Sequence, residues 1–146
     1  MTGTVTNRSG APVKDVLIEV WQVNADGAFP DHGDVEAEVR GWGRIIPDFE
    51  TDEFSFETVK PGAVSGRDGH RIKPHLNLWL VACGINIRLN TRISFGGEAG
   101  ASGDDPVLNL IEQEHLRNML ITRGDGDIYR FKISLQDENE TVFFNV

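Results

Sequence analysis

The feature that most constrains the fold is a strict two-residue alternation between residues 85 and 95. Successive side chains of a β-strand point to opposite faces of the sheet, so this alternation predicts a strand with one buried face and one polar face. Such a strand needs a second layer that covers its apolar side. The positions expected to face the core are Ile85, Ile87, Leu89, Thr91, Ile93 and Phe95, and those expected to face outward are Asn86, Arg88, Asn90, Arg92 and Ser94.

Shorter patterns of the same kind recur along the chain and predict further strands. The turn at residues 7–10 separates the first two strand-like segments, which we expect to form a hairpin. Residues 29–40 are rich in acids and glycine without a sustained period, so we expect a loop there. We predict one all-β domain over residues 1–146, a two-sheet β-sandwich. The remaining strands are expected at residues 3–6, 16–21, 54–58, 76–82, 129–135 and 141–146.

One segment has a helical pattern instead. Apolar residues recur at helical spacings between residues 107 and 120, and Asp104-Asp105-Pro106 precedes them. A carboxylate at a helix start accepts free amide protons, and proline loses no hydrogen bond at the first helical position. We therefore expect one helix near residues 106–122, ended by Gly124.

Composition argues against two classes of partner. The net charge of −9 repels phosphate backbones and anionic lipids, so we expect neither nucleic acid nor a membrane as a partner. No apolar run approaches the ~20 residues of a membrane span, and the first ten residues do not resemble a secretory signal. The single cysteine, Cys83, excludes a disulfide within the chain and suits a reducing compartment. We expect a cytoplasmic protein.

The side chains taken alone predict no complete catalytic site. His70 and His75 are five residues apart, which fits neither the strand nor the helix spacing of two ligands on one face. His75 shares a strand face with Asn77, but a carboxamide is a weak ligand for iron or zinc. A stand-alone metalloenzyme that uses His70, His75 and carboxylates stays open as one alternative. We interpret Cys83 as an inert small hydrophobe, and the three tryptophans as core and interface packing.

Several blocks of sequence resemble the intradiol ring-cleavage dioxygenase family. Together they span nearly the whole chain, in the order in which that family carries them. Two of them, Gly84–Ile87 and Pro106–Gln113, are similar to the alpha-type rather than the beta-type subunits of the family members that act on protocatechuate. The other blocks are Gly10–Gln22, Phe54–Gly62, Pro74–Leu78 and Tyr129–Phe144.

The resemblance implies a degenerate iron site in this chain. In the family, two tyrosinates and two histidines of the beta-type subunit hold a non-haem Fe(III), and that subunit cleaves protocatechuate with O2 to 3-carboxy-cis,cis-muconate. At the matching positions this chain has Phe29, Val64, His75 and Asn77, and Tyr129 is its only tyrosine. The resemblance therefore implies no metal and no catalytic residue in this chain.

The resemblance also implies a partner. A homologous beta-type subunit with iron is expected to pair with this chain in a larger hetero-oligomer, and an alpha-type surface to line the edge of its substrate cleft. Cys83 stands where alpha-type subunits have an arginine, and the family's N-terminal arm is expected to be absent. Arg88 and Arg92 are further candidates for the cleft edge, although we interpret them as structural surface arginines. The alternative is a purely structural or binding module that never contacts substrate.

Overall fold

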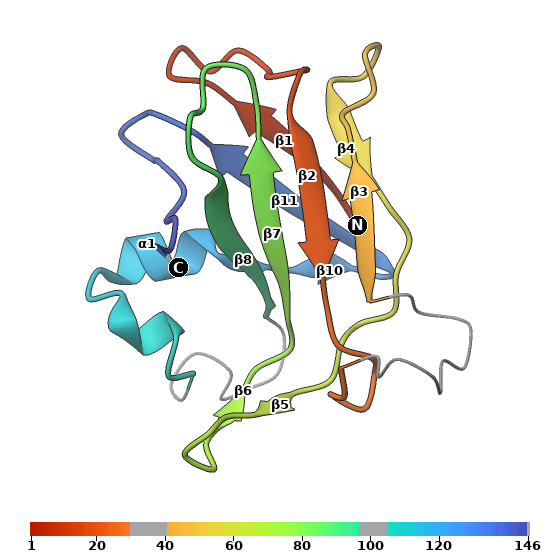
Figure 1. Ribbon diagram of the computed structural model, residues 1–146, viewed down its shortest axis with the longest axis vertical. Coiled ribbons are helices and arrows are strands. Elements are labelled where there is room, and N and C mark those ends of the chain that lie inside the picture. The colour runs from red at the N-terminus through yellow and green to blue at the C-terminus, as the bar shows by residue number, and fades with distance from the viewer. Residues whose placement is uncertain (30–40, 97–104, 146) are drawn as a thin grey trace.

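The computed structural model describes residues 1–29, 41–96 and 105–145, and these residues form a sandwich of two β-sheets (Figure 1). The five-stranded sheet has the order β3-β2-β7-β8-β9, the four-stranded sheet has the order β10-β11-β1-β4, and β5 and β6 form a separate ribbon. The strands are β1 (Thr2–Thr6), β2 (Leu17–Trp21), β3 (Trp42–Ile45), β4 (Glu53–Ser55), β5 (Val64–Ser65), β6 (Arg71–Ile72), β7 (His75–Val81), β8 (Leu89–Phe95), β9 (Ile121–Thr122), β10 (Gly124–Asp125) and β11 (Ile128–Ser134).

The core lies between the two sheets. Burial alternates along β7, where Leu76, Leu78 and Leu80 are fully buried while His75 and Asn77 are partly exposed on the other face. Each buried leucine contributes about 1.5–3 kcal/mol relative to an exposed one, so the core fixes which face of β7 turns outward. This confirms the prediction of an all-β sandwich. The opposite sheet contributes Val5, Phe54, Phe131 and Ile133 to the same core.

The first two strands do not form the expected hairpin. The turn itself is present, because Asn7 Oδ1 accepts hydrogen bonds from the amides of Ser9 and Ala11 at 3.0 Å each. However, β1 pairs in parallel with β11 and antiparallel with β4, while β2 pairs with β3 and β7. The prediction was wrong because the turn carries the chain from one sheet to the other.

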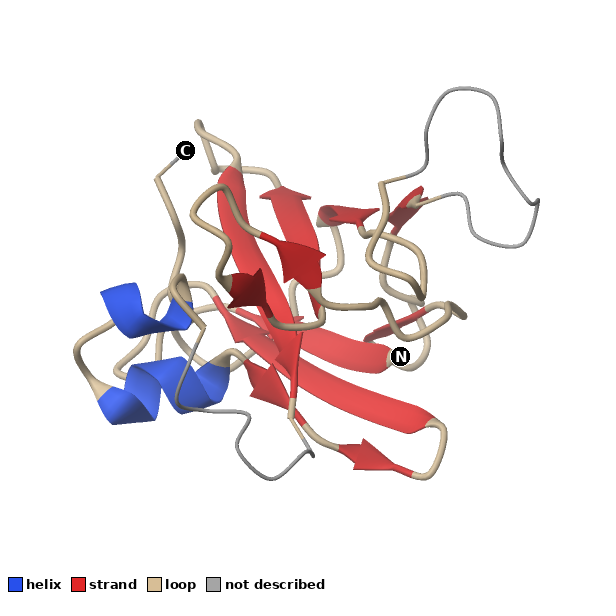
Figure 2. Ribbon diagram, turned by 90° about the horizontal axis from the view of Figure 1, so that it is seen from below, coloured by secondary structure: helices blue, strands red, loops and turns tan. Residues whose placement is uncertain are grey.

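The helical segment is broken into two short pieces. A 3₁₀-helix covers Leu108–Leu110 and α1 covers Glu114–Met119. Between them Ile111 is extended and buried in the core, which interrupts the single helix expected near residues 106–122. Both pieces lie at one side of the sandwich (Figure 2). No helix among the described residues is long and apolar enough to cross a membrane.

Three predicted strands are shorter than expected. The strand expected at residues 54–58 is β4, which ends at Ser55. β8 begins at Leu89, and Ile87, which we expected in the core, is 79% exposed. Of the strand expected at residues 141–146, the described residues 141–145 form only an isolated bridge, in which the Phe144 amide donates to the Asn90 carbonyl at 2.7 Å. Most of the loop expected at residues 29–40 lies outside the described residues.

Candidate functional site

One register row crosses the outer face of the five-stranded sheet. Trp42 of β3 lies opposite Trp21 of β2, Trp21 lies opposite Asn77 of β7, and Asn77 lies opposite Arg92 of β8. This row includes a predicted site residue, Asn77, and a candidate for the cleft edge, Arg92. The candidate site therefore lies along this row.

Arg92 ends this row in a buried ion pair. Its Nη2 lies 2.8 Å from Oδ2 of Asp105, and its Nε donates to Oγ of Ser94 at 3.1 Å. Arg92 is only 3% exposed and Asp105 is fully buried. The interpretation of Arg92 as a surface arginine was therefore wrong, because the outward face of β8 is covered at this position.

Asp105 joins three segments of the chain. Besides Arg92, it accepts hydrogen bonds from the amide of Lys73 before β7, and from the amides of Val107 and Leu108 at the start of the 3₁₀-helix, at 2.9–3.1 Å. Burial alone would raise the pKa of Asp105, but the charge of Arg92 and these amides hold it below its ordinary value. We call Arg92, Asp105 and these backbone donors the Arg92–Asp105 clamp.

The clamp also positions His75, the first residue of β7. His75 Nδ1 lies 2.6 Å from the carbonyl oxygen of Lys73, whose amide donates to Asp105. Since a carbonyl only accepts, Nδ1 carries the proton and Nε2 is left as the acceptor nitrogen. Burial lowers the pKa of His75, and the charge of Arg92 lowers it further. The imidazole is therefore held neutral.

The residues at the degenerate ligand positions do not fit a ferric ion. The backbone brings the relevant segments together, because the Gly62 amide donates to the Asn24 carbonyl at 2.9 Å and so holds the turn before Phe29 against the segment before Val64. Yet Phe29 and Val64 have no donor atom, and one imidazole with the carboxamide of Asn77 is not a ligand set for ferric iron.

Metal-ligating side chains elsewhere in the described residues form no site either. Within the described ranges, no group of three or more His, Cys, Asp or Glu side chains is arranged to hold a metal ion. His70 and His115 are exposed. The alternative of a stand-alone metalloenzyme therefore finds no ligand set in this part of the chain.

The only tyrosine lies on the other sheet. Tyr129 belongs to β11, and its ring meets the ring of Phe95 edge to face, with centroids 5.0 Å apart and planes at 81°. Such a contact stabilises packing between the sheets.

Cys83 lies at a second candidate place, just after β7. It is exposed and lines a cleft of about 920 Å³ together with Lys14, Asp15, Asn86 and Ile87. A hydrogen bond with Asp15, and the charge of that carboxylate, raise the pKa of the thiol. Cys83 is therefore not the buried hydrophobe that we expected, although its thiol is still a poor nucleophile because it stays protonated.

Comparisons with known proteins place the chain in a family. The family model described as "Dioxygenase" matches residues 1–136. The protocatechuate 3,4-dioxygenase alpha chain of Pseudomonas putida is 43% identical over 149 residues, which cover 99% of this chain and 74% of the relative. The chain belongs to the intradiol dioxygenase family.

Two further relatives bear on the assignment. The protocatechuate 3,4-dioxygenase beta chain of Burkholderia cepacia is 31% identical and covers 97% of this chain, which covers 65% of that relative. The dioxygenase domain of a dioxygenase and carbohydrate-binding protein fusion from Streptomyces sp. SirexAA-E has the same fold, with a TM-score of 0.62 at 19% identity, over 96% of this chain and 78% of that one. These findings confirm the predicted intradiol dioxygenase fold.

Proposed function

We propose that this intradiol dioxygenase chain is the non-catalytic alpha-type subunit of a protocatechuate 3,4-dioxygenase. A homologous beta subunit would hold the non-haem Fe(III) and cleave the bond between the two hydroxyl-bearing carbons of protocatechuate, with both atoms of O2 entering 3-carboxy-cis,cis-muconate. The observation that carries the proposal is the donor set. Of the four ligand positions, Phe29 and Val64 offer no donor, Asn77 offers a weak one, and only His75 offers an imidazole.

An iron-free subunit can still affect the reaction of its partner. It can exclude water from the mouth of the partner's cleft and supply shape and charge there. The cleft beside Cys83 is the candidate edge, since it is open and lined by Lys14, Asn86 and Ile87. We assign Arg88 to a different place, because its guanidinium lies over the ring of Trp79.

Metal analysis of the purified chain tests the proposal. The chain expressed alone should contain no stoichiometric iron and show no ring-cleavage activity, and co-expression with a beta-type chain from the same organism should yield an active complex. Stoichiometric iron with a phenolate charge-transfer colour in the isolated chain would contradict the proposal. Failure of the two chains to associate would contradict it as well.

Cys83 favours a second candidate, a purely structural subunit that never contacts substrate. The thiol is neutral and hydrogen-bonded to Asp15, so this position offers no cation to an anionic substrate. In the complex, Cys83→Arg should lower KM for protocatechuate if this cleft borders the substrate, while Cys83→Ser serves as the matched control. An unchanged KM for both variants, with assembly intact, favours the structural role.

A further inference from the structure

All three tryptophans of the sequence lie side by side on the outer face of the five-stranded sheet. The ring centroids of Trp21 and Trp42 are 5.8 Å apart, and those of Trp21 and Trp79 are 6.3 Å apart. Arg44 lies over Trp42 at 5.1 Å, and Arg88 lies over Trp79 at 4.7 Å. We call these five residues the Trp–Arg patch.

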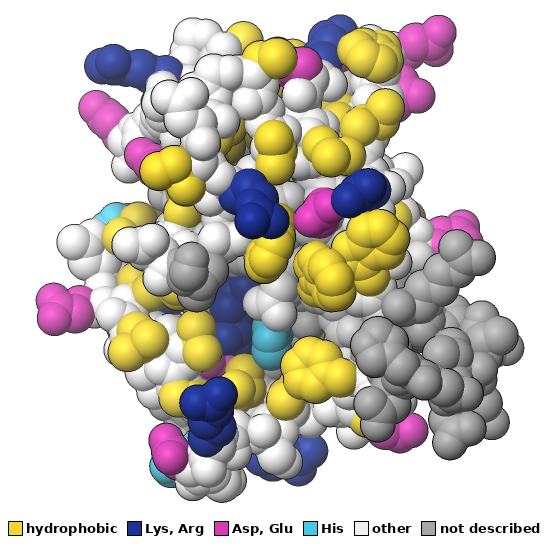
Figure 3. Space-filling view, in the orientation of Figure 1, with side chains coloured by type: hydrophobic (Ala, Val, Ile, Leu, Met, Phe, Trp, Pro, Cys, Tyr) yellow, Lys and Arg dark blue, Asp and Glu magenta, His cyan; other side chains and the backbone are white. Residues whose placement is uncertain are grey.

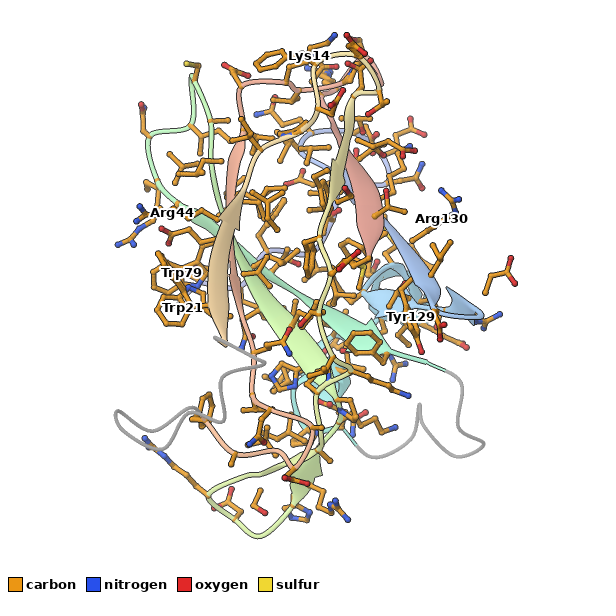
Figure 4. The ribbon with its side chains drawn as sticks, turned by 90° about the vertical axis from the view of Figure 1, so that its right-hand side faces the viewer. Lys14, Trp21, Arg44, Trp79, Tyr129 and Arg130 are labelled. Carbon is orange, nitrogen blue, oxygen red and sulfur yellow. The ribbon has the colours of Figure 1, made fainter. Side chains whose placement is uncertain are left out.

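The patch faces away from the core and is not covered by the helices. Trp21 is 44% exposed and Trp42 is 42% exposed. Trp21, Trp79 and Arg44 project from the same side of the sandwich (Figure 4), and hydrophobic side chains gather near the middle of that face with charged side chains beside them (Figure 3). Packing among the described residues therefore leaves much of this aromatic surface open to solvent.

The chemistry of the patch is that of a protein interface. Tryptophan and arginine are the residue types that most often dominate binding energy, whereas most other surface residues contribute little. Here each guanidinium already rests on a ring, so the side chains lose little conformational entropy when a partner covers them. A partner that covers Trp21 would lie beside Asn77, its neighbour in the register row.

The charges of the patch discriminate between partners. Arg44 is paired with Glu19 at 2.8 Å, but no carboxylate within residues 1–29, 41–96 and 105–145 forms an ion pair with Arg88. In a second copy related by a twofold axis through the middle of the patch, Arg44 of one copy would approach Arg88 of the other. Such a like-charge contact is unfavourable. A related but different chain can present carboxylates instead.

We propose that the Trp–Arg patch is the surface through which this chain docks on its beta-type partner, which covers the rings and presents carboxylates to Arg44 and Arg88. This inference rests on the proposed function, because that function supplies the partner. It also places the partner against the face of the sheet that carries the degenerate ligand positions His75 and Asn77.

Binding measurements with charge-reversed variants test this inference. The double variant Arg44→Glu/Arg88→Glu, and separately Trp42→Ala, should weaken the complex with the co-expressed beta-type chain at least about tenfold. Matched controls lie on the opposite sheet, where Arg130→Glu and Ile128→Ala alter exposed residues of β11. The controls should leave the dissociation constant unchanged within about twofold, a change of under about 0.5 kcal/mol. Circular dichroism melts of each variant show whether it is folded.

A second measurement needs no substitution. Because the patch contains every tryptophan of the chain, 5-fluorotryptophan labelling gives fluorine NMR signals from Trp21, Trp42 and Trp79 alone. Unlabelled beta-type chain should shift these signals if it covers the patch. Association without any shift, or with both patch variants binding as tightly as the wild type, would overturn the inference and leave the proposed function intact.

Two other outcomes are distinguishable. If the wild-type chain does not bind the beta-type chain at all, the proposed function fails first. If the chain alone forms a dimer through the patch as tightly as it binds the beta-type chain, the assignment to a different partner is overturned. Sedimentation velocity of the chain alone and of the mixture separates these cases.

Discussion

Three arginines on the outer face of the five-stranded sheet lie in two different environments. Arg92 is buried, paired with Asp105 and surrounded by the segments that precede β7 and the 3₁₀-helix. Arg44 and Arg88 lie at the surface, each against a tryptophan ring. Their positions in the sequence do not distinguish them. Arg44 and Arg92 are at outward-facing positions of β3 and β8, and Arg88 immediately precedes β8. The difference is what covers them: other segments of this chain pack over Arg92, whereas Arg44 and Arg88 stay exposed to solvent.

The largest expected effect is the loss of Arg92. In Arg92→Leu, Asp105 would keep its buried position without its cation, and leaving such a charge unpaired costs about 3–5 kcal/mol. Urea unfolding of the isolated chain measures this loss. Arg88→Leu is the matched control and should change the free energy of unfolding by less than about 0.5 kcal/mol, since it is a surface substitution.

A double-mutant cycle sharpens the same comparison. Arg92→Leu/Asp105→Asn should be less destabilised than the sum of the two single variants, because each single variant leaves one buried group without its partner. Additive effects of the two substitutions would show that the ion pair is not coupled, and the distinction between Arg92 and the surface arginines would fail.

Acid should destabilise the protein by protonating Asp105 of the clamp. Since the pKa of Asp105 is held below its ordinary value of 3.8, the stability that this carboxylate contributes is present above that pH and is lost as the pH falls further. The unfolding free energy of the wild type should therefore decline below about pH 4, and Asp105→Asn should show a smaller decline. Part of the decline will persist, because Asp48 and Asp137 also have lowered pKa values.

The sequence predicted which side of a strand faces the core better than it predicted which strands pair with each other. Alternation identified the core-facing side of β8, which carries Ile93 and Phe95, because the period of a strand depends only on local geometry. The hairpin of β1 and β2 was wrong because pairing depends on contacts far apart in sequence, such as Val5 with Ile133. Strand order is a property of the whole chain and is not encoded in any single segment.

The candidate site shows the same limit. The lack of donor atoms at Phe29 and Val64 follows from residue identity, so it could be read directly from the sequence. The burial of Arg92 could not be read from the sequence, because Asp105 pairs with Arg92, and the amide of Lys73 donates to Asp105, only in the folded chain. The grouping of the tryptophans was equally hidden, since it depends on the register between β3, β2 and β7.

A smaller pH effect is expected from His75. Its pKa is lowered from an ordinary value of 6.5, so the unfolded chain binds this proton more readily than the folded chain does. Stability should therefore decrease as the pH falls from about 6.5 toward the folded pKa, well before Asp105 titrates. Urea unfolding at about pH 7.5 and about pH 5.5 should show this decrease in the wild type and a reduced one in His75→Gln. An identical decrease in both proteins would contradict the burial of a neutral imidazole.

The smallest effect on the unfolding free energy of the isolated chain is expected from a substitution in the Trp–Arg patch. Arg44 and Glu19 form an ion pair with Arg44 largely exposed, and exposed pairs contribute only about 0.2–1 kcal/mol. Arg44→Ala should therefore leave the unfolding free energy nearly unchanged while it weakens binding to the beta-type chain. If Arg44→Ala instead destabilised the isolated chain as much as Arg92→Leu does, the patch would belong to the folding framework, and the contrast between the two sides of the sheet would disappear.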